Sequence, residues 1–137
     1  MQVVRLDHAT ITTTDLAASI AFYGHFLGLK PGFRPHFSRG GAWLYPEGGD
    51  YPIVHLIEKE GPREGGKFDH LAFRHKDLNA YLEKVKASGV KYMAVPVDET
   101  NLVQIQHRDP NHVLIEVTFE DETIAPSDII GPDVCRP

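Results

Sequence analysis

Apolar and polar residues partly alternate in short runs along the first half of the chain, and a period of two predicts strands. We expect these strands at residues 3–13, 29–34, 41–45 and 52–58. Between the first two, apolar residues recur every three or four positions, which predicts a helix with one apolar face. Thr14 or Asp15 can cap this helix, and Gly28 can end it. The predicted order is therefore strand, helix, strand, strand, strand.

The second half of the chain repeats this order. Strands are predicted at residues 68–74, 90–95, 102–107 and 112–119, with a helix capped by Asp77 and ended by Gly89. Residues 61–67 are rich in glycine and charge and predict a linker. We therefore expect a single domain over residues 1–137, built from module one at about 3–60 and module two at about 68–119. An irregular surface tail is expected at 120–137.

Two short patterns recur in both modules. An apolar-Asp-His-apolar run at residues 6–9 and again at 68–71 places His8 and His70 at an offset of 62 (70 − 8). In the last strand of each module a polar residue interrupts an apolar run, at His55 and at Glu116, an offset of 61 (116 − 55). An internal repeat of this length with mixed elements predicts a duplicated module whose two copies pack around one axis.

The composition excludes several classes of function. The chain is 42% hydrophobic and 24% charged, with a net charge of −5, which argues against a nucleic-acid or anionic-membrane surface. No apolar stretch approaches the roughly 20 residues of a membrane span, and the first residues do not resemble a signal peptide. The single cysteine, Cys135, cannot form an intrachain disulfide, so we expect a cytoplasmic protein. No P-loop, dinucleotide glycine motif, Gly-x-Ser-x-Gly or paired Cys-x-x-Cys is present in the sequence.

Ionisable side chains within apolar strands are costly unless they are paired or bind a metal. For one such residue, a core group bonded to the backbone is the simpler explanation. Four at related positions favour a metal site, and three imidazoles with one carboxylate suit zinc, iron, nickel or manganese. These candidate ligands are His8, His55, His70 and Glu116.

Other polar and aromatic residues are weaker candidates. The remaining histidines, His107 among them, are assigned structural or solvent roles. Five other side chains could contact a substrate: Arg34, Arg39, Trp43, Tyr45 and Gln104. A role in the core or on the surface is the simpler explanation for each of them.

The motifs resemble the vicinal oxygen chelate superfamily, which includes glyoxalase I, methylmalonyl-CoA epimerase, fosfomycin-resistance proteins, extradiol dioxygenases and bleomycin-resistance proteins. The resemblance spans about residues 4–119, with matching motifs at 6–11, 19–23, 27–29, 69–73, 109–111 and 115–117. It implies an α+β fold of two tandem βαβββ modules. These would form a cupped, barrel-like mixed sheet with the helices outside and a metal in the cup.

The resemblance also implies the roles of the four candidate ligands, which in the family come from the first and fourth strands of each module. His55 departs from the family pattern, because glyoxalase I usually has Glu there and the epimerase Gln. The implied function is a metal-dependent lyase or isomerase of the glyoxalase type. Such an enzyme chelates two adjacent oxygens of a small substrate and stabilises an enediolate, with Glu116 or a water on the metal as the base.

Two other functions stay open. An Fe(II)-dependent extradiol-type dioxygenase would use His8, His70 and Glu116 as a facial triad, with His55 as an acid or base beside the metal. A non-catalytic small-molecule-binding protein like the bleomycin-resistance members is the third, although those usually lack the metal ligands. Related small members commonly form homodimers, so we expect a homodimer whose modules pair within one chain or between chains. The expected partner is a small-molecule substrate, without nucleic acid or membrane.

Overall fold

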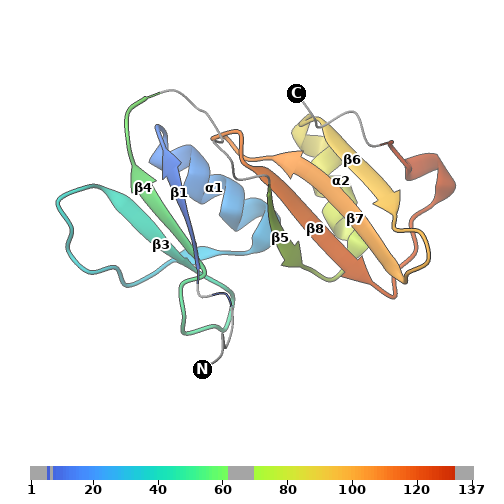
Figure 1. The fold of residues 1–137 in the computed structure, drawn as a ribbon, viewed down its shortest axis with the longest axis horizontal. Helices are drawn as coiled ribbons and strands as arrows, with labels where there is room; N and C mark the ends of the chain where they lie inside the picture. The colour runs from blue at the N-terminus through green and yellow to red at the C-terminus, as the bar shows by residue number, and fades with distance from the viewer. Residues whose placement is uncertain (1–5, 7, 62–69, 132–137) are drawn as a thin grey trace. The chain divides into compact units, whose positions relative to one another are not determined.

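The computed structural model describes residues 6, 8–61 and 70–131, and the chain divides into two compact units, residues 1–64 and 65–137. In the described residues each unit holds one four-stranded mixed sheet and one long helix (Figure 1). The predicted α+β class and the duplicated strand-helix-strand-strand-strand order are confirmed.

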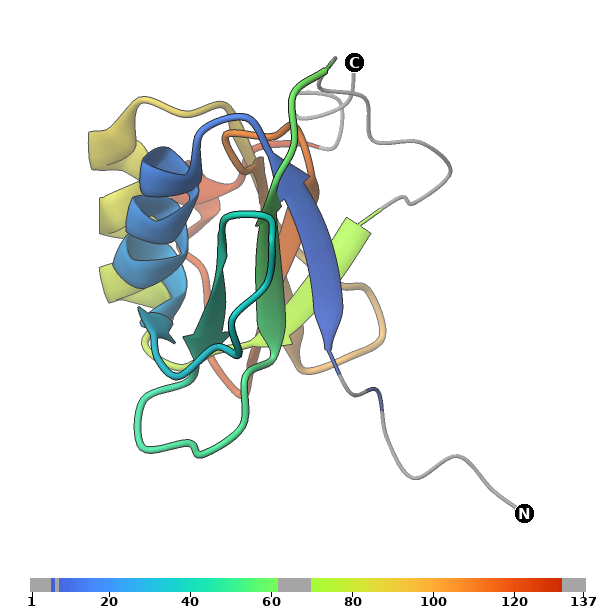
Figure 2. The same cartoon turned by 90° about the vertical axis from the view of Figure 1, so that its left-hand side faces the viewer.

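Unit one contains a sheet with the strand order β1-β4-β3-β2, in which β1 is parallel to β4 and the other pairs are antiparallel. Helix α1 lies along one face of this sheet (Figure 2). Its elements are β1 (Ala9–Thr13), α1 (Leu16–Leu27), β2 (Lys30–Pro31), β3 (Gly41–Tyr45) and β4 (Val54–Glu58).

Strand β2 is much shorter than the predicted 29–34. Beyond Gly32, the carbonyl of Phe33 accepts a hydrogen bond from the Tyr45 hydroxyl at 2.6 Å, so a side chain takes the place of a strand N–H there. For the first strand, residues 3–5 and 7 of the prediction lie outside the described residues.

Helix α1 begins and ends as its sequence predicts. The Asp15 side chain accepts the backbone N–H of Ala18 at 3.0 Å, which satisfies one of the free donors of the first turn. Gly28 ends the helix with φ of 66°, a conformation that a Cβ would penalise. The buried face carries Tyr23 and Phe26 against the sheet.

Unit two has the strand order β5-β8-β7-β6, with β5 parallel to β8 and the other pairs antiparallel, so it repeats the topology of unit one. Helix α2 packs on β7, where its Tyr81 hydroxyl shares a hydrogen bond of 2.7 Å with Nε2 of His107. Its elements are β5 (His70–Arg74), α2 (Leu78–Ser88), β6 (Tyr92–Pro96), β7 (Leu102–Arg108), β8 (Leu114–Glu120) and the short 3-10 helix η1 (Pro126–Asp128).

The predicted N-cap position of α2 is confirmed at Asp77, but the predicted capping by its side chain is wrong. Asp77 occupies the position before the helix, but it has φ of 66° and, within the described part of the chain, its side chain makes no capping hydrogen bond. The carboxylate of Glu122 instead accepts the backbone N–H of Leu78 at 2.8 Å. A residue distant in sequence therefore stabilises this helix N-terminus, an arrangement that local patterns do not reveal.

The segment after β8 is more than a surface tail. Ile124 is buried, and Ile130 forms a two-bond β-bridge with Ala94 of β6. Lys86 of α2 donates to the carboxylate of Asp128 at 2.7 Å. The expectation of an irregular surface tail is therefore wrong for this part of the chain, and residues 132–137, with Cys135, lie outside the described residues.

Each sheet has a face that points away from its own helix, here called the helix-free face. In unit one the helix-facing residues Ile11 and Leu56 are buried, whereas Thr10 points the other way and is exposed. In unit two Ile115 and Val117 face the helix and are fully buried. The alternation along the strands places all four candidate ligands on helix-free faces.

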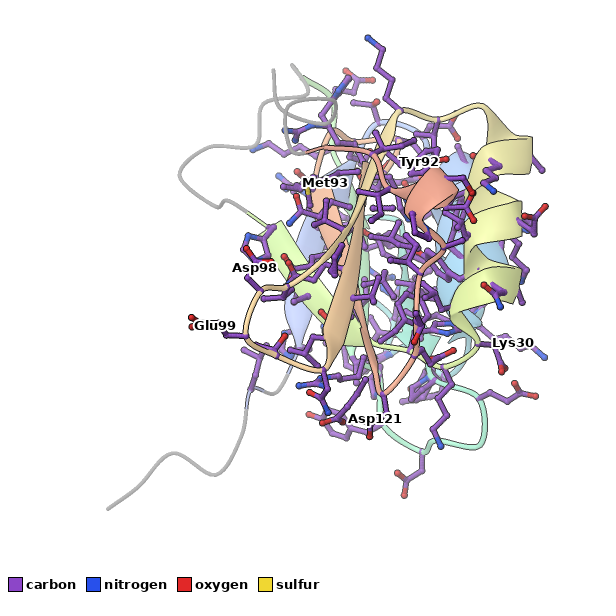
Figure 3. The ribbon with its side chains drawn as sticks, turned by 90° about the vertical axis from the view of Figure 1, so that its right-hand side faces the viewer. Lys30, Tyr92, Met93, Asp98, Glu99 and Asp121 are labelled. Carbon is purple, nitrogen blue, oxygen red and sulfur yellow. The ribbon has the colours of Figure 1, made fainter. Side chains whose placement is uncertain are left out.

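One exposed turn of unit two is acidic. The turn between β6 and β7 carries Asp98 and Glu99, both exposed, and Figure 3 shows the Glu99 side chain projecting from it. Of the helices in the described residues, none has the length and apolar character needed to cross a membrane.

Candidate metal centre

The two candidate ligands of unit one lie against each other. His8 directly precedes β1, and its imidazole stacks on that of His55 in β4, with ring centroids 3.8 Å apart and 14° between the ring planes. The register explains the contact, because Thr10 pairs with His55 and His8 is two residues away on the same face. The two imidazoles are therefore in contact within unit one, and their role as metal ligands stays a prediction.

A third ring extends this stack. Trp43 of β3 pairs with His55 across the β3–β4 ladder, and its indole lies 4.2 Å from the imidazole at an angle of 11°. Because two rings cannot occupy the same face at such distances, Trp43 and His8 cover opposite faces of His55. Phe37 approaches Trp43 at 6.2 Å. Trp43 was proposed as a substrate contact, and the structure gives it a contact with a candidate ligand.

The two candidate ligands of unit two also lie close together. Nε2 of His70 is 3.9 Å from Oε2 of Glu116. The His70 side chain is 38% exposed and that of Glu116 is 12% exposed, so the carboxylate is the more buried of the two. Ala72 pairs with Glu116 across the parallel β5–β8 ladder, which is the counterpart of Thr10 and His55 in unit one.

Two glutamine side chains hold the carboxylate of Glu116. The amide of Gln104 donates to Oε1 at 2.9 Å, and the amide of Gln106 donates to Oε2 at 2.8 Å. Gln104 was proposed as a weak substrate contact, and Gln106 was not proposed at all. The signal for both was the alternation of Gln with Val103 and Ile105, which puts the amides on one face of β7.

The remaining proposed substrate contacts are Arg34 and Arg39 in the loop between β2 and β3, and Tyr45 at the end of β3. The Arg34 guanidinium donates to the Arg39 carbonyl at 3.0 Å and lies 4.8 Å from the centre of the Phe37 ring. The Tyr45 hydroxyl donates to the Phe33 carbonyl. These contacts shape the loop itself, so Arg34 and Tyr45 have structural roles there.

His107 of β7 faces helix α2 and is fully buried. Burial lowers its pKa to about 4, and burial also raises the pKa of its partner Tyr81. Because burial disfavours the charged form, His107 is a neutral core residue. The structural role expected for it is confirmed.

The four candidate ligands thus form two pairs, one in each unit. Within the described ranges, no group of three or more His, Cys, Asp or Glu residues is arranged to hold a metal ion. The donor types nevertheless fit a divalent transition metal, since imidazole suits zinc, iron and nickel and carboxylate suits manganese.

The two pairs differ in how ready they are to bind a metal. Two donor atoms that bind one metal ion at about 2.1 Å each lie about 3–3.4 Å from each other. The distance of 3.9 Å between Nε2 of His70 and Oε2 of Glu116 is close to this value. In unit one, an imidazole lone pair lies in the ring plane, and the planes of His8 and His55 are parallel and stacked. One of the two rings must therefore turn before both can bind the same ion.

Comparisons with known proteins agree with this architecture. The chain is 34% identical over 95 residues to the uncharacterized protein YwbC of Bacillus subtilis (strain 168), covering 65% of this chain and 75% of that protein. A mutant of the fosfomycin resistance protein FosX from Listeria monocytogenes, complexed with Mn(II) and 1S,2S-dihydroxypropylphosphonic acid, has a similar fold. Its TM-score is 0.71 at 17% identity, over 93% of this chain and 97% of that one.

A second solved structure has the same fold. The glyoxylase/bleomycin resistance protein/dioxygenase domain from Frankia sp. EAN1pec gives a TM-score of 0.71 at 19% identity, over 87% of this chain and 99% of that one. At these identities both structures show the fold alone. The family model matches residues 5–117. With the duplicated βαβββ units, this match shows that the chain belongs to the Glyoxalase/Bleomycin resistance protein/Dioxygenase superfamily.

Proposed function

We propose that the protein is a metal-dependent lyase or isomerase that binds two adjacent oxygens of a small substrate and stabilises an enediolate. The observation that carries the proposal is the pairing of candidate ligands at matching positions of the two units. His8 contacts His55 in unit one, and His70 lies beside Glu116 in unit two. A role in packing could explain one such pair. It would not explain why a second pair of candidate ligands lies at the same position of the repeated topology.

The proposed ligands are the four residues of the two pairs, and a divalent metal bound by them would act as a Lewis acid on the substrate oxygens. Glu116 is also the proposed proton acceptor for the carbon next to the substrate carbonyl. Its carboxylate is only 12% exposed and is held by two amides, which suits a group that must keep a fixed position. The FosX structure with Mn(II) supports including manganese among the metals to test.

One observation favours a second candidate, an Fe(II)-dependent dioxygenase of the extradiol type. His55 is stacked between Trp43 and His8, so its ring is already held by two neighbouring rings. If His8 turns away to bind the metal and His55 stays on Trp43, the ligands would be His8, His70 and Glu116. His55 would then act as an acid or base next to the substrate.

Metal analysis of protein purified without chelators tests the proposal first. We expect about one equivalent of zinc, iron, nickel or manganese per chain, and protein without metal that does not respond to added metal would favour a non-catalytic binding protein. Two assays of the metal-loaded protein then separate the candidates. Turnover of a 2-oxoaldehyde such as methylglyoxal, with and without glutathione, supports the isomerase, and catechol-dependent oxygen uptake with Fe(II) supports the dioxygenase.

We also propose that the protein acts in the cytoplasm as a homodimer on a small-molecule substrate. Membership of the superfamily and the acidic net charge of −5 support a small-molecule partner over nucleic acid. Light scattering coupled to size-exclusion chromatography tests the assembly. A mass of twice the 15.3 kDa of the chain is expected, and a mass equal to one chain would contradict it.

A further inference from the structure

Strands β3 and β7 are the antiparallel neighbours of β4 and β8, which carry His55 and Glu116. Each of these neighbours presents a side chain directly to the candidate ligand. Trp43 of β3 pairs with His55, and Gln106 of β7 pairs with Glu116. These are the same positions of the repeated topology, because both are the antiparallel partners of the fourth-strand ligand. In each unit the partner suits its ligand, since an indole stacks on an imidazole and an amide donates to a carboxylate.

Unit two has a second donor at a position where unit one has a glycine. Gln104 lies two residues before Gln106 on the same face of β7, and its position corresponds to Gly41 of β3. Gly41 has no side chain, and a Cβ there would come within 2.2 Å of the Leu56 carbonyl oxygen. Two amides therefore act on Glu116, one on each carboxylate oxygen, at 2.9 and 2.8 Å.

Two hydrogen bonds to the two oxygens of one carboxylate fix both its position and its plane. A glutamate side chain has several rotatable bonds, so an unheld carboxylate loses this freedom when it binds a metal. An ionised carboxylate has about four acceptor positions, and the two amides use one on each oxygen. Each oxygen of Glu116 thus keeps acceptor capacity on the side away from its glutamine.

We propose that Gln104 and Gln106 are positioning residues that hold Glu116 in its metal-binding orientation and thereby set the metal affinity of the protein. The inference rests on the proposed function, since it takes Glu116 as a ligand. Groups that hydrogen-bond a ligating carboxylate orient it, and their loss weakens metal binding by about 10- to 100-fold. Partial burial strengthens such hydrogen bonds, because little water competes for them.

The test compares Mn²⁺ affinity, measured by isothermal titration, in the wild type, Gln104→Met, Gln106→Met and the double variant. Methionine keeps the length of the side chain and removes the N–H donors. We expect about tenfold weaker binding for each single variant and about 100-fold for the double variant. In a Glu116→Gln background the same substitutions should have no further effect, which isolates the coupling to this carboxylate.

A measurement on the metal-free protein guards against misfolded variants. The side-chain amide resonances of Gln104 and Gln106 should both shift in nuclear magnetic resonance spectra when Glu116 is replaced by Gln. Unchanged resonances, or folded variants that bind Mn²⁺ within twofold of the wild type, would overturn the inference and leave the proposed function standing. A wild type that binds none of Mn²⁺, Zn²⁺, Ni²⁺ or Fe²⁺ would overturn the proposed function and the inference with it.

Discussion

The indole ring of Trp43 lies parallel to the imidazole ring of His55, with 4.2 Å between the ring centroids and 11° between the planes. Trp43 is the single tryptophan of the chain, so all tryptophan fluorescence comes from a ring in contact with a candidate ligand. The protein therefore carries its own reporter for the occupancy of unit one.

Replacing His55 by Phe should abolish most metal-dependent quenching of this fluorescence. Phenylalanine keeps a ring to stack on Trp43 but has no donor for a metal, so we expect Ni²⁺ to quench the wild type and to bind the variant at least tenfold more weakly. Fluorescence titration measures both affinities. His25→Phe is the matched control, because His25 is exposed on α1. Equal loss in the control variant would assign the quenching to nonspecific binding.

The match between each ligand and its cross-strand partner predicts a rescue. His55→Glu alone should bind Mn²⁺ more weakly than the same variant with a donor at position 43, because the new carboxylate would face the indole of Trp43 with no donor from that side. Adding Trp43→Gln recreates in unit one the pairing of Gln106 with Glu116, and should recover about tenfold in affinity. Isothermal titration of the single and double variants checks this. A double variant weaker than His55→Glu would contradict the matching of partner and ligand.

The two helix N-termini should respond differently to loss of their nearest aspartate. Asp15→Ala and Glu122→Ala should each lower the free energy of unfolding by about 1 kcal/mol, because each carboxylate accepts a free helix N–H. Asp77→Gly should be neutral or stabilising by up to about 1 kcal/mol, since it relieves a residue with φ of 66°. Urea unfolding curves measure all three. A cost for Asp77→Gly equal to that of Glu122→Ala would refute this assignment.

His107 should make the protein sensitive to mild acid. Its pKa is lowered to about 4 in the folded state from 6.5, so between these values the unfolded state binds more protons than the folded state. Stability should therefore be complete above about pH 6.5 and fall as the pH approaches 4, by about 3 kcal/mol from this residue. Unfolding curves measured at several pH values give the slope.

His107→Gln provides the control for this pH dependence. The Gln carbonyl can accept the Tyr81 hydroxyl, and the amide does not titrate in this range. The variant should lose the part of the acid sensitivity that comes from His107. If its stability falls with pH as steeply as that of the wild type, another group is responsible.

The elements could be predicted from the sequence wherever local patterns decide the structure. The alternation in β3 and the cap of α1 by Asp15 depend on neighbouring residues only, and both predictions are confirmed. The cap of α2 by Glu122 and the bridge of Ile130 to Ala94 depend on residues far apart in the chain. Such contacts form only once the sheet exists, so no local pattern indicates them.

The sequence indicated candidate ligands, but it did not indicate the side chains that contact them. The repeat identified His8, His55, His70 and Glu116, because the offset of 61 or 62 residues is visible in the sequence. The contact of Gln106 with Glu116 depends on the register of β7 against β8. A shift of one residue would have put the Gln106 side chain on the opposite face of the sheet. The joint binding of one metal by both pairs stays a prediction.

Tryptophan fluorescence can test that prediction across the two units. Glu116→Gln and His70→Gln alter unit two only, whereas Trp43 reports from unit one. If the four residues hold one metal, each substitution should weaken the Ni²⁺ affinity measured by Trp43 quenching by at least tenfold, as His55→Phe does. Quenching curves identical to the wild type in both unit-two variants would contradict a shared metal centre.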